Sequence, residues 1–132
     1  MKKIPFLILV WFTTILFSQN TIYVKDFNAI VDDQIDDTAQ INAAIKTLTD
    51  GDTLVFEEGI YHLESLSSFG ISHVDIRNTV NITLLGAQDS NGKPTTHFQR
   101  KLELFPENTR YSLLYCRNNK GLHVKNMTFD NT

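Results

Sequence analysis

The sequence of 132 residues contains a single cysteine, Cys116, so no disulfide bond can form within the chain. Its formal net charge is only −3, and the chain therefore lacks the basic surplus typical of nucleic-acid binding. It also lacks a phosphate-binding glycine loop and the Gly-x-Ser-x-Gly motif of serine hydrolases. Disorder is excluded, because apolar residues make up 42% of the chain, which is enough for one small globular core.

The longest apolar run lies at the amino terminus and is too short for a comfortable transmembrane helix. Residues 4–17 read IPFLILVWFTTILF, two lysines precede them, and the small residue Ser18 follows. This layout is typical of a secretory signal peptide. We therefore predict a signal peptide over residues 1–18, a secreted, periplasmic or cell-surface location, and no stable membrane insertion after cleavage. An uncleaved membrane anchor is the alternative.

Chemically reactive side chains are scattered rather than clustered along the remaining sequence. Cys116 lies in the strand-like run YSLLYCRN, and we predict a buried free thiol, because only Arg117 is near enough in sequence to activate it. His97, Arg100 and Lys101 could contact an acidic sugar chain, but the turn signal DSNGKP before them favours a solvated loop. The other histidines of the mature chain have no metal-ligand spacing.

One segment has the periodicity of an amphipathic helix. Its apolar face consists of Ile41, Ala44, Ile45 and Leu48. We predict that Asp37 caps the amino terminus of this helix and that Gln40 completes a capping box. The sequence TDGD, residues 49–52, is predicted to end the helix at its glycine.

The rest of the mature chain has the alternating pattern of short strands separated by turns, which indicates an all-β protein. Asparagine is frequent at the breaks, where it tolerates the left-handed backbone of tight corners. Two segments, NTVNITLLG (residues 78–86) and NKGLHVKNMTF (residues 119–129), are alike. Their separation suits two turns of a solenoid with repeats of roughly 20 residues. A β-sandwich with a helical insert is the alternative.

Two blocks in the first half of the chain carry a family signature. The stretch VKDFNAIVDDQIDDTAQINAAI (residues 24–45) and the block GDTLVFEEGIYHL (residues 51–63) together resemble the amino-terminal signature of the pectate-lyase-like right-handed parallel β-helix superfamily. The matching positions are Val24, Asp26, Phe27, Ala29, Asp32, Asp36, Asp37, Thr38, Ile41, Ala44, Ile45, Gly51, Thr53, Val55, Phe56, Gly59, Tyr61 and Leu63. The glycines of the signature's turn are replaced by Asn28, Val31 and Asp33, so we expect that turn to differ locally.

The resemblance implies a right-handed parallel β-helix with an amino-terminal capping α-helix. Residues 22–50 would form the cap segment, and residues 51–132 would form the first coils of the β-helix. The five aspartates of the first block, Asp26, Asp32, Asp33, Asp36 and Asp37, would then hold the turn and cap the helix. A loose calcium site at three of them, Asp32, Asp33 and Asp36, is the alternative. An EF-hand is excluded, because Asp37 and Ala43 occupy its glycine and glutamate positions.

The resemblance also implies an exported protein that acts on pectin- or uronate-type polysaccharides as a hydrolase, lyase or epimerase. Hydrolases of this family use two carboxylates on central coils, beyond the matched stretch. We therefore assign no catalytic, cofactor-binding or metal-binding residue, and we expect residues 19–132 to be the amino-terminal part of a longer β-helix domain. A noncatalytic cell-surface or glycan-binding β-helix module is the alternative.

Overall fold

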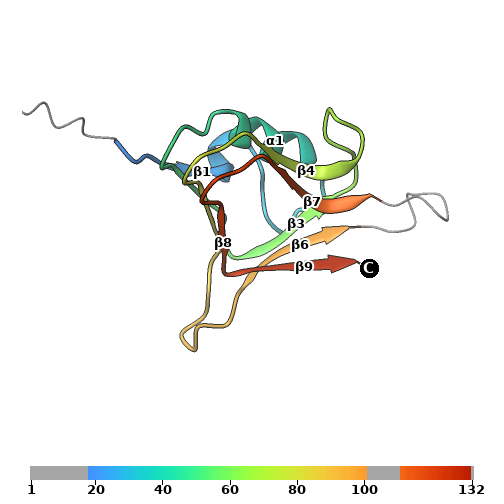
Figure 1. The fold of residues 1–132 in the computed structure, drawn as a ribbon. Helices are drawn as coiled ribbons and strands as arrows, with labels where there is room; N and C mark the ends of the chain where they lie inside the picture. The colour runs from blue at the N-terminus through green and yellow to red at the C-terminus, as the bar shows by residue number, and fades with distance from the viewer. Residues whose placement is uncertain (1–17, 101–110, 132) are drawn as a thin grey trace, which may run out of the picture.

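The computed structural model describes residues 18–100 and 111–131, in which strands predominate and one α-helix is present (Figure 1). Most of the predicted signal peptide, and Lys101, lie outside these residues. The elements in chain order are β1 (Thr21–Tyr23), the 3-10 helix η1 (Val24–Phe27), α1 (Thr38–Lys46), β2 (Thr53–Val55), β3 (Gly59–Leu63), β4 (Ser72–Arg77), β5 (Thr83–Leu85), β6 (Thr96–Arg100), β7 (Ser112–Arg117), β8 (His123–Lys125) and β9 (Met127–Asn131).

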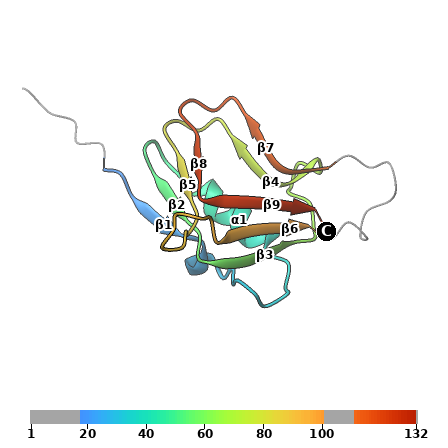
Figure 2. The ribbon, with the colours of Figure 1, turned by 90° about the horizontal axis from the view of Figure 1, so that it is seen from below.

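The strands form three parallel sheets with the orders β1-β2-β5-β8, β3-β6-β9 and β4-β7. From β2 onward the chain visits the three sheets in turn, so each strand pairs with one that lies a full circuit away in sequence, whereas β1 pairs with the next strand, β2. Figure 2 shows the three sheets as three sides around the interior, and Figure 1 shows α1 at one end of the stacked strands. The strand-rich architecture with one helix is confirmed. A sandwich of antiparallel sheets is inconsistent with the parallel pairing.

The two similar sequence segments lie one circuit apart rather than two. Thr83 pairs with His123 on the neighbouring strands β5 and β8, and Val80 bridges to Lys120 at the corner before them. The predicted repeat of roughly 20 residues is therefore wrong. Each circuit is longer because the connections between sheets carry loops, such as residues 86–95 between β5 and β6.

Columns of apolar side chains from the three sheets form the core. In-register parallel pairing places Tyr61, Phe98 and Phe129 in one column, because paired residues face the same side of a sheet. Phe56 packs edge-to-face against Tyr61 and Phe98, with ring centroids 5.7 Å and 5.2 Å apart. Phe56, Tyr61 and Phe98 are fully buried and belong to this core.

Helix α1 lies where the periodicity predicts it, but both of its ends differ from the prediction. Ile41, Ala44 and Ile45 are buried against the core, as expected. The helix stops at Lys46 with Thr47 as its C-cap, so the prediction that the glycine of TDGD ends it is wrong. The Thr47 hydroxyl donates to the carbonyl oxygen of Ala44, 2.7 Å away, and so satisfies an acceptor of the last turn.

At the amino-terminal end of the helix, the predicted capping box does not form. Asp37 occupies the N-cap position, but its side chain makes no capping hydrogen bond to the helix. Its carboxylate instead accepts the N–H groups of Ile30 and His62, at 3.0 Å and 3.1 Å. The first N–H of the helix, that of Thr38, donates to Asp36 at 3.0 Å. The carbonyl oxygen of the Gln40 side chain has no hydrogen-bond partner.

The aspartates of the opening stretch cover the free edge of β3. Alternate N–H groups along this edge, those of Ile60, His62 and Glu64, donate to the carboxylates of Asp32, Asp37 and Asp36 respectively. On β4, the side chain of Asn42 in α1 accepts the N–H of Asp75 and donates to the carbonyl oxygen of His73. Of the predicted roles, Asp33 holds the turn by accepting the N–H of Ile35, and Asp36 accepts the first N–H of the helix. Satisfying these edge groups, which would otherwise stay unpaired, is a role that was not predicted.

The turn that carries these aspartates contains residues with left-handed backbone. Its left-handed residues are Asn28, Asp32 and Gln34, with φ of 64°, 61° and 61°. Val31 and Asp33, which replace glycines of the signature, are not among them. Asparagines at the corners between sheets, such as Asn78 and Asn118, also have left-handed φ, which confirms the prediction for the breaks.

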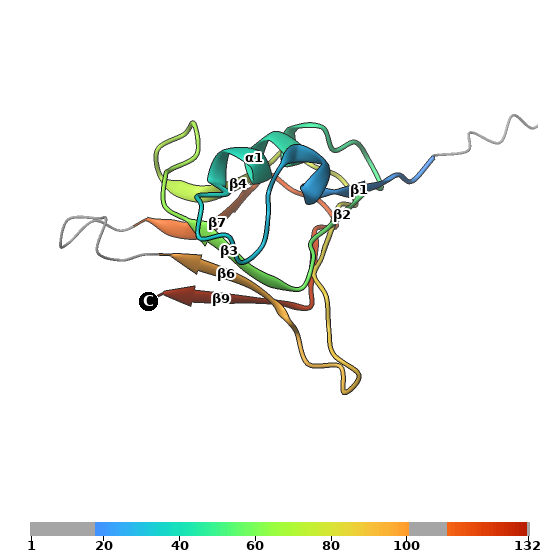
Figure 3. The same cartoon turned by 180° about the vertical axis from the view of Figure 1, so that it is seen from behind.

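The opposite end of the described sheets is uncovered (Figure 3). Val124 and Phe129 continue the inward-facing columns of β8 and β9, yet they are 39% and 38% exposed. Cys116 on β7 pairs with the buried Ile76 and is itself exposed, so the predicted burial of its thiol is wrong. The reason is that β7 is the outer strand of its sheet among the described residues.

Candidate functional site

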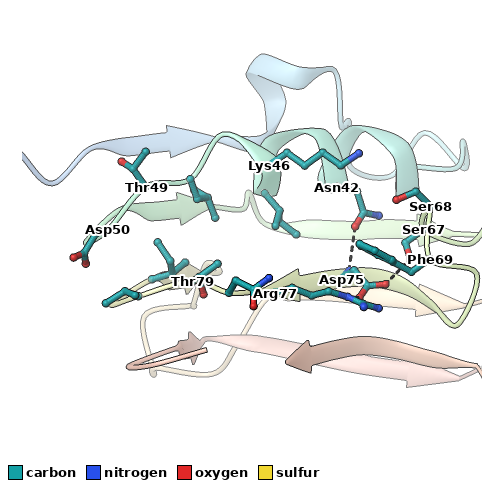
Figure 4. A pocket seen from close by; sticks show the side chains of 15 residues that line it. Asn42, Lys46, Thr49, Asp50, Ser67, Ser68, Phe69, Asp75, Arg77 and Thr79 are labelled. Atoms are coloured by element: carbon teal, nitrogen blue, oxygen red, sulfur yellow. Dashed lines mark hydrogen bonds and ion pairs between the residues drawn. The ribbon is translucent and has the colours of Figure 1, made fainter. Parts of the chain in front are cut away.

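A pocket with a volume of about 470 Å³ opens between helix α1, strand β4 and the connection from β4 to β5 (Figure 4). This volume lies within the range of small-ligand sites. Its apolar lining consists of Ile45, Leu48, Val80 and Ile82, and its polar groups come from α1, from β4, from the loop before β4 and from the segments that follow α1 and β4. The part of this lining that comes from α1 is Ile45, which lies on the apolar face of the helix.

Asp75 anchors one wall of the pocket. One of its carboxylate oxygens accepts the hydroxyl groups of Ser67 and Ser72, and the other accepts Nε of Arg77 at 2.7 Å. Burial alone would raise the pKa of Asp75, but these hydrogen bonds outweigh it and hold the pKa below its usual value. Asp75 is therefore a fixed anion without a free oxygen, and it is unsuited to proton transfer.

Phe69 presents an aromatic ring at the mouth of the pocket. The guanidinium carbon of Arg77 lies 3.6 Å from the centroid of the Phe69 ring, and the ring remains 54% exposed. The loop that carries Phe69 is closed by the Ser67 hydrogen bond to Asp75 and by Gly70, whose N–H donates to the Ser67 carbonyl oxygen. Gly70 has a φ of 69°, which favours glycine there. The ring is thus held in place before any ligand binds.

Two charged side chains lie at opposite ends of the pocket (Figure 4). Lys46 extends along α1 toward the loop that carries Ser67, Ser68 and Phe69. Its ammonium group forms no ion pair with any residue in the described part of the chain. Asp50 lies at the other end, where one of its oxygens accepts the side-chain amide of Asn81 at 3.2 Å. Lys46 therefore adds a positive charge, unpaired among the described residues, at the end where Asp75 and Arg77 neutralise each other, and Asp50 adds a negative charge at the other end.

Two of the residues that could contact an acidic sugar lie elsewhere, on β6. His97 and Arg100 are strand residues, so the predicted solvated loop is wrong for them. Nδ1 of His97 contacts the Thr128 hydroxyl and lies 3.6 Å from an Asp130 carboxylate oxygen. Both contacts use the same ring nitrogen, whereas a catalytic relay needs both nitrogens. Arg100 donates to the carbonyl oxygen of Tyr111 at 2.7 Å.

The remaining candidate chemistry is weaker. Partial burial and the nearby charge of Asp75 raise the pKa of the Cys116 thiol, which disfavours its reactive thiolate. Within residues 18–100 and 111–131, no three histidine, cysteine, aspartate or glutamate side chains are grouped so that they could hold a metal ion. In the turn suggested as a calcium site, Asp32, Asp33 and Asp36 all accept backbone N–H groups. The one described α-helix is too short to span a membrane.

Sequence reasoning missed the residues that make the pocket. Lys46, Phe69 and Arg77 come from a helix, a loop and a strand, and only the fold brings them together. One signal was available, because an aromatic residue in the turn-like sequence Ser-Ser-Phe-Gly (residues 67–70) has no strand or helix to pack it.

The fold and the pocket define a class of protein. The class is a strand-rich protein with parallel sheets, in which a helix and side-chain carboxylates cover one end and a pocket lies beside that helix. No family model, no curated protein and no solved structure matches the chain. Its function is therefore inferred from the residues and their geometry.

Proposed function

We propose that the chain is the amino-terminal portion of a right-handed parallel β-helix in an exported protein that acts on acidic polysaccharides. The observation that carries this proposal is the order of the strands. Each sheet receives one strand per circuit, and successive strands pair in parallel and in register, as in the coils of a solenoid. A right-handed sense is favoured because parallel crossover connections are right-handed in nearly all proteins.

The two ends of the described sheets support the same proposal. Residues 22–50 act as a cap, because Asp32, Asp36 and Asp37 pair with the edge of β3 and Asn42 pairs with that of β4. The columns at the other end continue to exposed apolar side chains, which suits further coils stacked on them. Catalytic residues of a hydrolase, lyase or epimerase would lie on those coils.

The second candidate is a noncatalytic glycan-binding β-helix module, and the state of Asp75 favours it. Glycoside hydrolysis needs one carboxylic acid and one carboxylate on either side of the scissile bond. In the pocket, the hydrogen bonds from Ser67, Ser72 and Arg77 occupy both oxygens of Asp75 and lower its pKa. The pocket itself is therefore suited to binding rather than to bond cleavage.

The test compares the natively exported protein with residues 19–132. Its intact mass is measured first, and both proteins are then assayed on polygalacturonate, alginate and a neutral polysaccharide. We expect the exported protein to be larger than residues 19–132 and to convert an acidic polysaccharide, and we expect residues 19–132 to bind it without turnover. Binding without turnover by the exported protein would select the noncatalytic module. Absence of binding to any polysaccharide would refute the proposal.

A further inference from the structure

We propose that the pocket beside α1 binds one uronic acid residue of a glycan chain, with Lys46 contacting the sugar carboxylate and Phe69 contacting the sugar ring. The inference rests on the polysaccharide function proposed above and assigns it a site. The pocket is separate from the coils on which catalytic residues would lie. It would hold the glycan without cleaving it.

Lys46 is the group that selects for a carboxylate. Two cations reach the pocket, but Arg77 is already paired with Asp75 and stacked on Phe69. The Lys46 ammonium has no such partner among the described residues, and it lies on an exposed position of α1. A charge-assisted hydrogen bond from an ammonium to a carboxylate is stronger than one between neutral groups. A uronate therefore gains a contact here that a neutral sugar does not.

Phe69 is the group that receives the sugar ring. The apolar C–H face of a pyranose packs on aromatic rings, and Phe69 is 54% exposed at the mouth of the pocket. The Arg77 guanidinium fixes the ring from one side, so the ring loses little freedom when a ligand binds. The loop hydroxyl of Ser68 also lines this end of the pocket, where it can hydrogen-bond a sugar hydroxyl.

Asp50 sets the direction of the bound sugar. It lies at the end of the pocket opposite the tip of Lys46 and is exposed (Figure 4). Its negative charge repels a carboxylate at that end but accepts hydrogen bonds from sugar hydroxyls. The uronate carboxylate is therefore oriented toward Lys46, and the pocket volume of about 470 Å³ leaves room for the adjoining glycosidic linkage.

The test measures binding of trigalacturonate and of neutral galactotriose to the mature full chain by isothermal titration calorimetry. We expect trigalacturonate to bind more tightly, and Lys46→Gln to weaken its binding about tenfold without changing the binding of galactotriose. Lys93→Gln is the matched control, because it removes the same charge from an exposed turn outside the pocket. Equal effects of the two lysine changes on trigalacturonate binding would overturn the proposal.

A second pair of variants tests the ring contact. Phe69→Ala is expected to weaken binding of both oligosaccharides about tenfold, whereas Phe69→Tyr keeps the ring and is expected to preserve binding. If the mature chain binds trigalacturonate but neither Lys46→Gln nor Phe69→Ala alters that binding, the pocket is not the site and the proposed function stands. If the mature chain binds no glycan, the site and the proposed function both fail.

Discussion

Replacing Phe98 with alanine is expected to lower the free energy of unfolding of residues 19–132 by about 4–5 kcal/mol. The Phe98 side chain is fully buried in the middle of its column. Its ring packs edge-to-face against Phe56, Tyr61 and Phe129, with centroids 5.2 Å, 5.8 Å and 5.6 Å apart. Truncation of a buried phenylalanine costs about 3–5 kcal/mol, and the lost aromatic contacts place Phe98 at the upper end of that range.

The matched control is Phe129→Ala, which removes the same ring from the next position of the same column. Phe129 is 38% exposed, so we expect its loss to cost about 1–2 kcal/mol. Urea denaturation followed by far-ultraviolet circular dichroism gives both values. Equal losses of unfolding free energy for the two variants would show that Phe129 is covered in residues 19–132. A loss of unfolding free energy below about 1 kcal/mol for Phe98→Ala would refute the assigned core.

Four further variants test the hydrogen bonds and charges at the capped end of the chain. Asp52→Ala should lower the free energy of unfolding by about 2–3 kcal/mol in urea denaturation, because the buried Asp52 carboxylate accepts four hydrogen bonds. Asp50→Ala is the control, and it should cost less than about 0.5 kcal/mol because Asp50 is exposed. Asn42→Asp keeps the acceptor for the N–H of Asp75 but loses the donor to His73, so its melting temperature should fall, and an unchanged value would contradict the pairing with β4. Burial raises the pKa of Asp37 from 3.8 to about 6, so its contribution to stability is complete below pH 3.8 and is lost as the pH rises through 6. The stability of the natural chain relative to Asp37→Asn should therefore fall between pH 4 and pH 6, and a rise over this range would refute the sign.

Local patterns in the sequence predicted the features that local physics decides. The spacing of Ile41, Ala44 and Ile45 encodes one helix face, and these residues are buried. Asparagines at breaks predicted left-handed corners, as at Asn78 and Asn118, because the residue itself tolerates that backbone. These predictions depend only on residues that are near one another in the sequence, and not on contacts between distant segments.

Predictions failed where a partner distant in sequence decides the outcome. The Asp37 carboxylate was predicted to cap α1, but it accepts the N–H of His62 on β3 instead. Burial of Cys116 depends on whether another strand covers β7, which the run YSLLYCRN does not encode. The pocket was missed for the same reason, since Lys46 and Phe69 become neighbours only when the loop before β4 folds back toward α1.

The carboxylates along β3 make the two outer edges of the sheet β3-β6-β9 unequal in their ability to pair with a further strand. A strand that approaches the β3 edge meets N–H groups already occupied by Asp32, Asp36 and Asp37, together with their negative charge. A strand that approaches β7, β8 or β9 meets an outer strand with one side open among the described residues. In the sheet β3-β6-β9, a further strand can therefore pair with β9 but not with β3. A head-to-tail contact in which the β9 edge of one molecule would pair with the β3 edge of another is disfavoured by the same side chains.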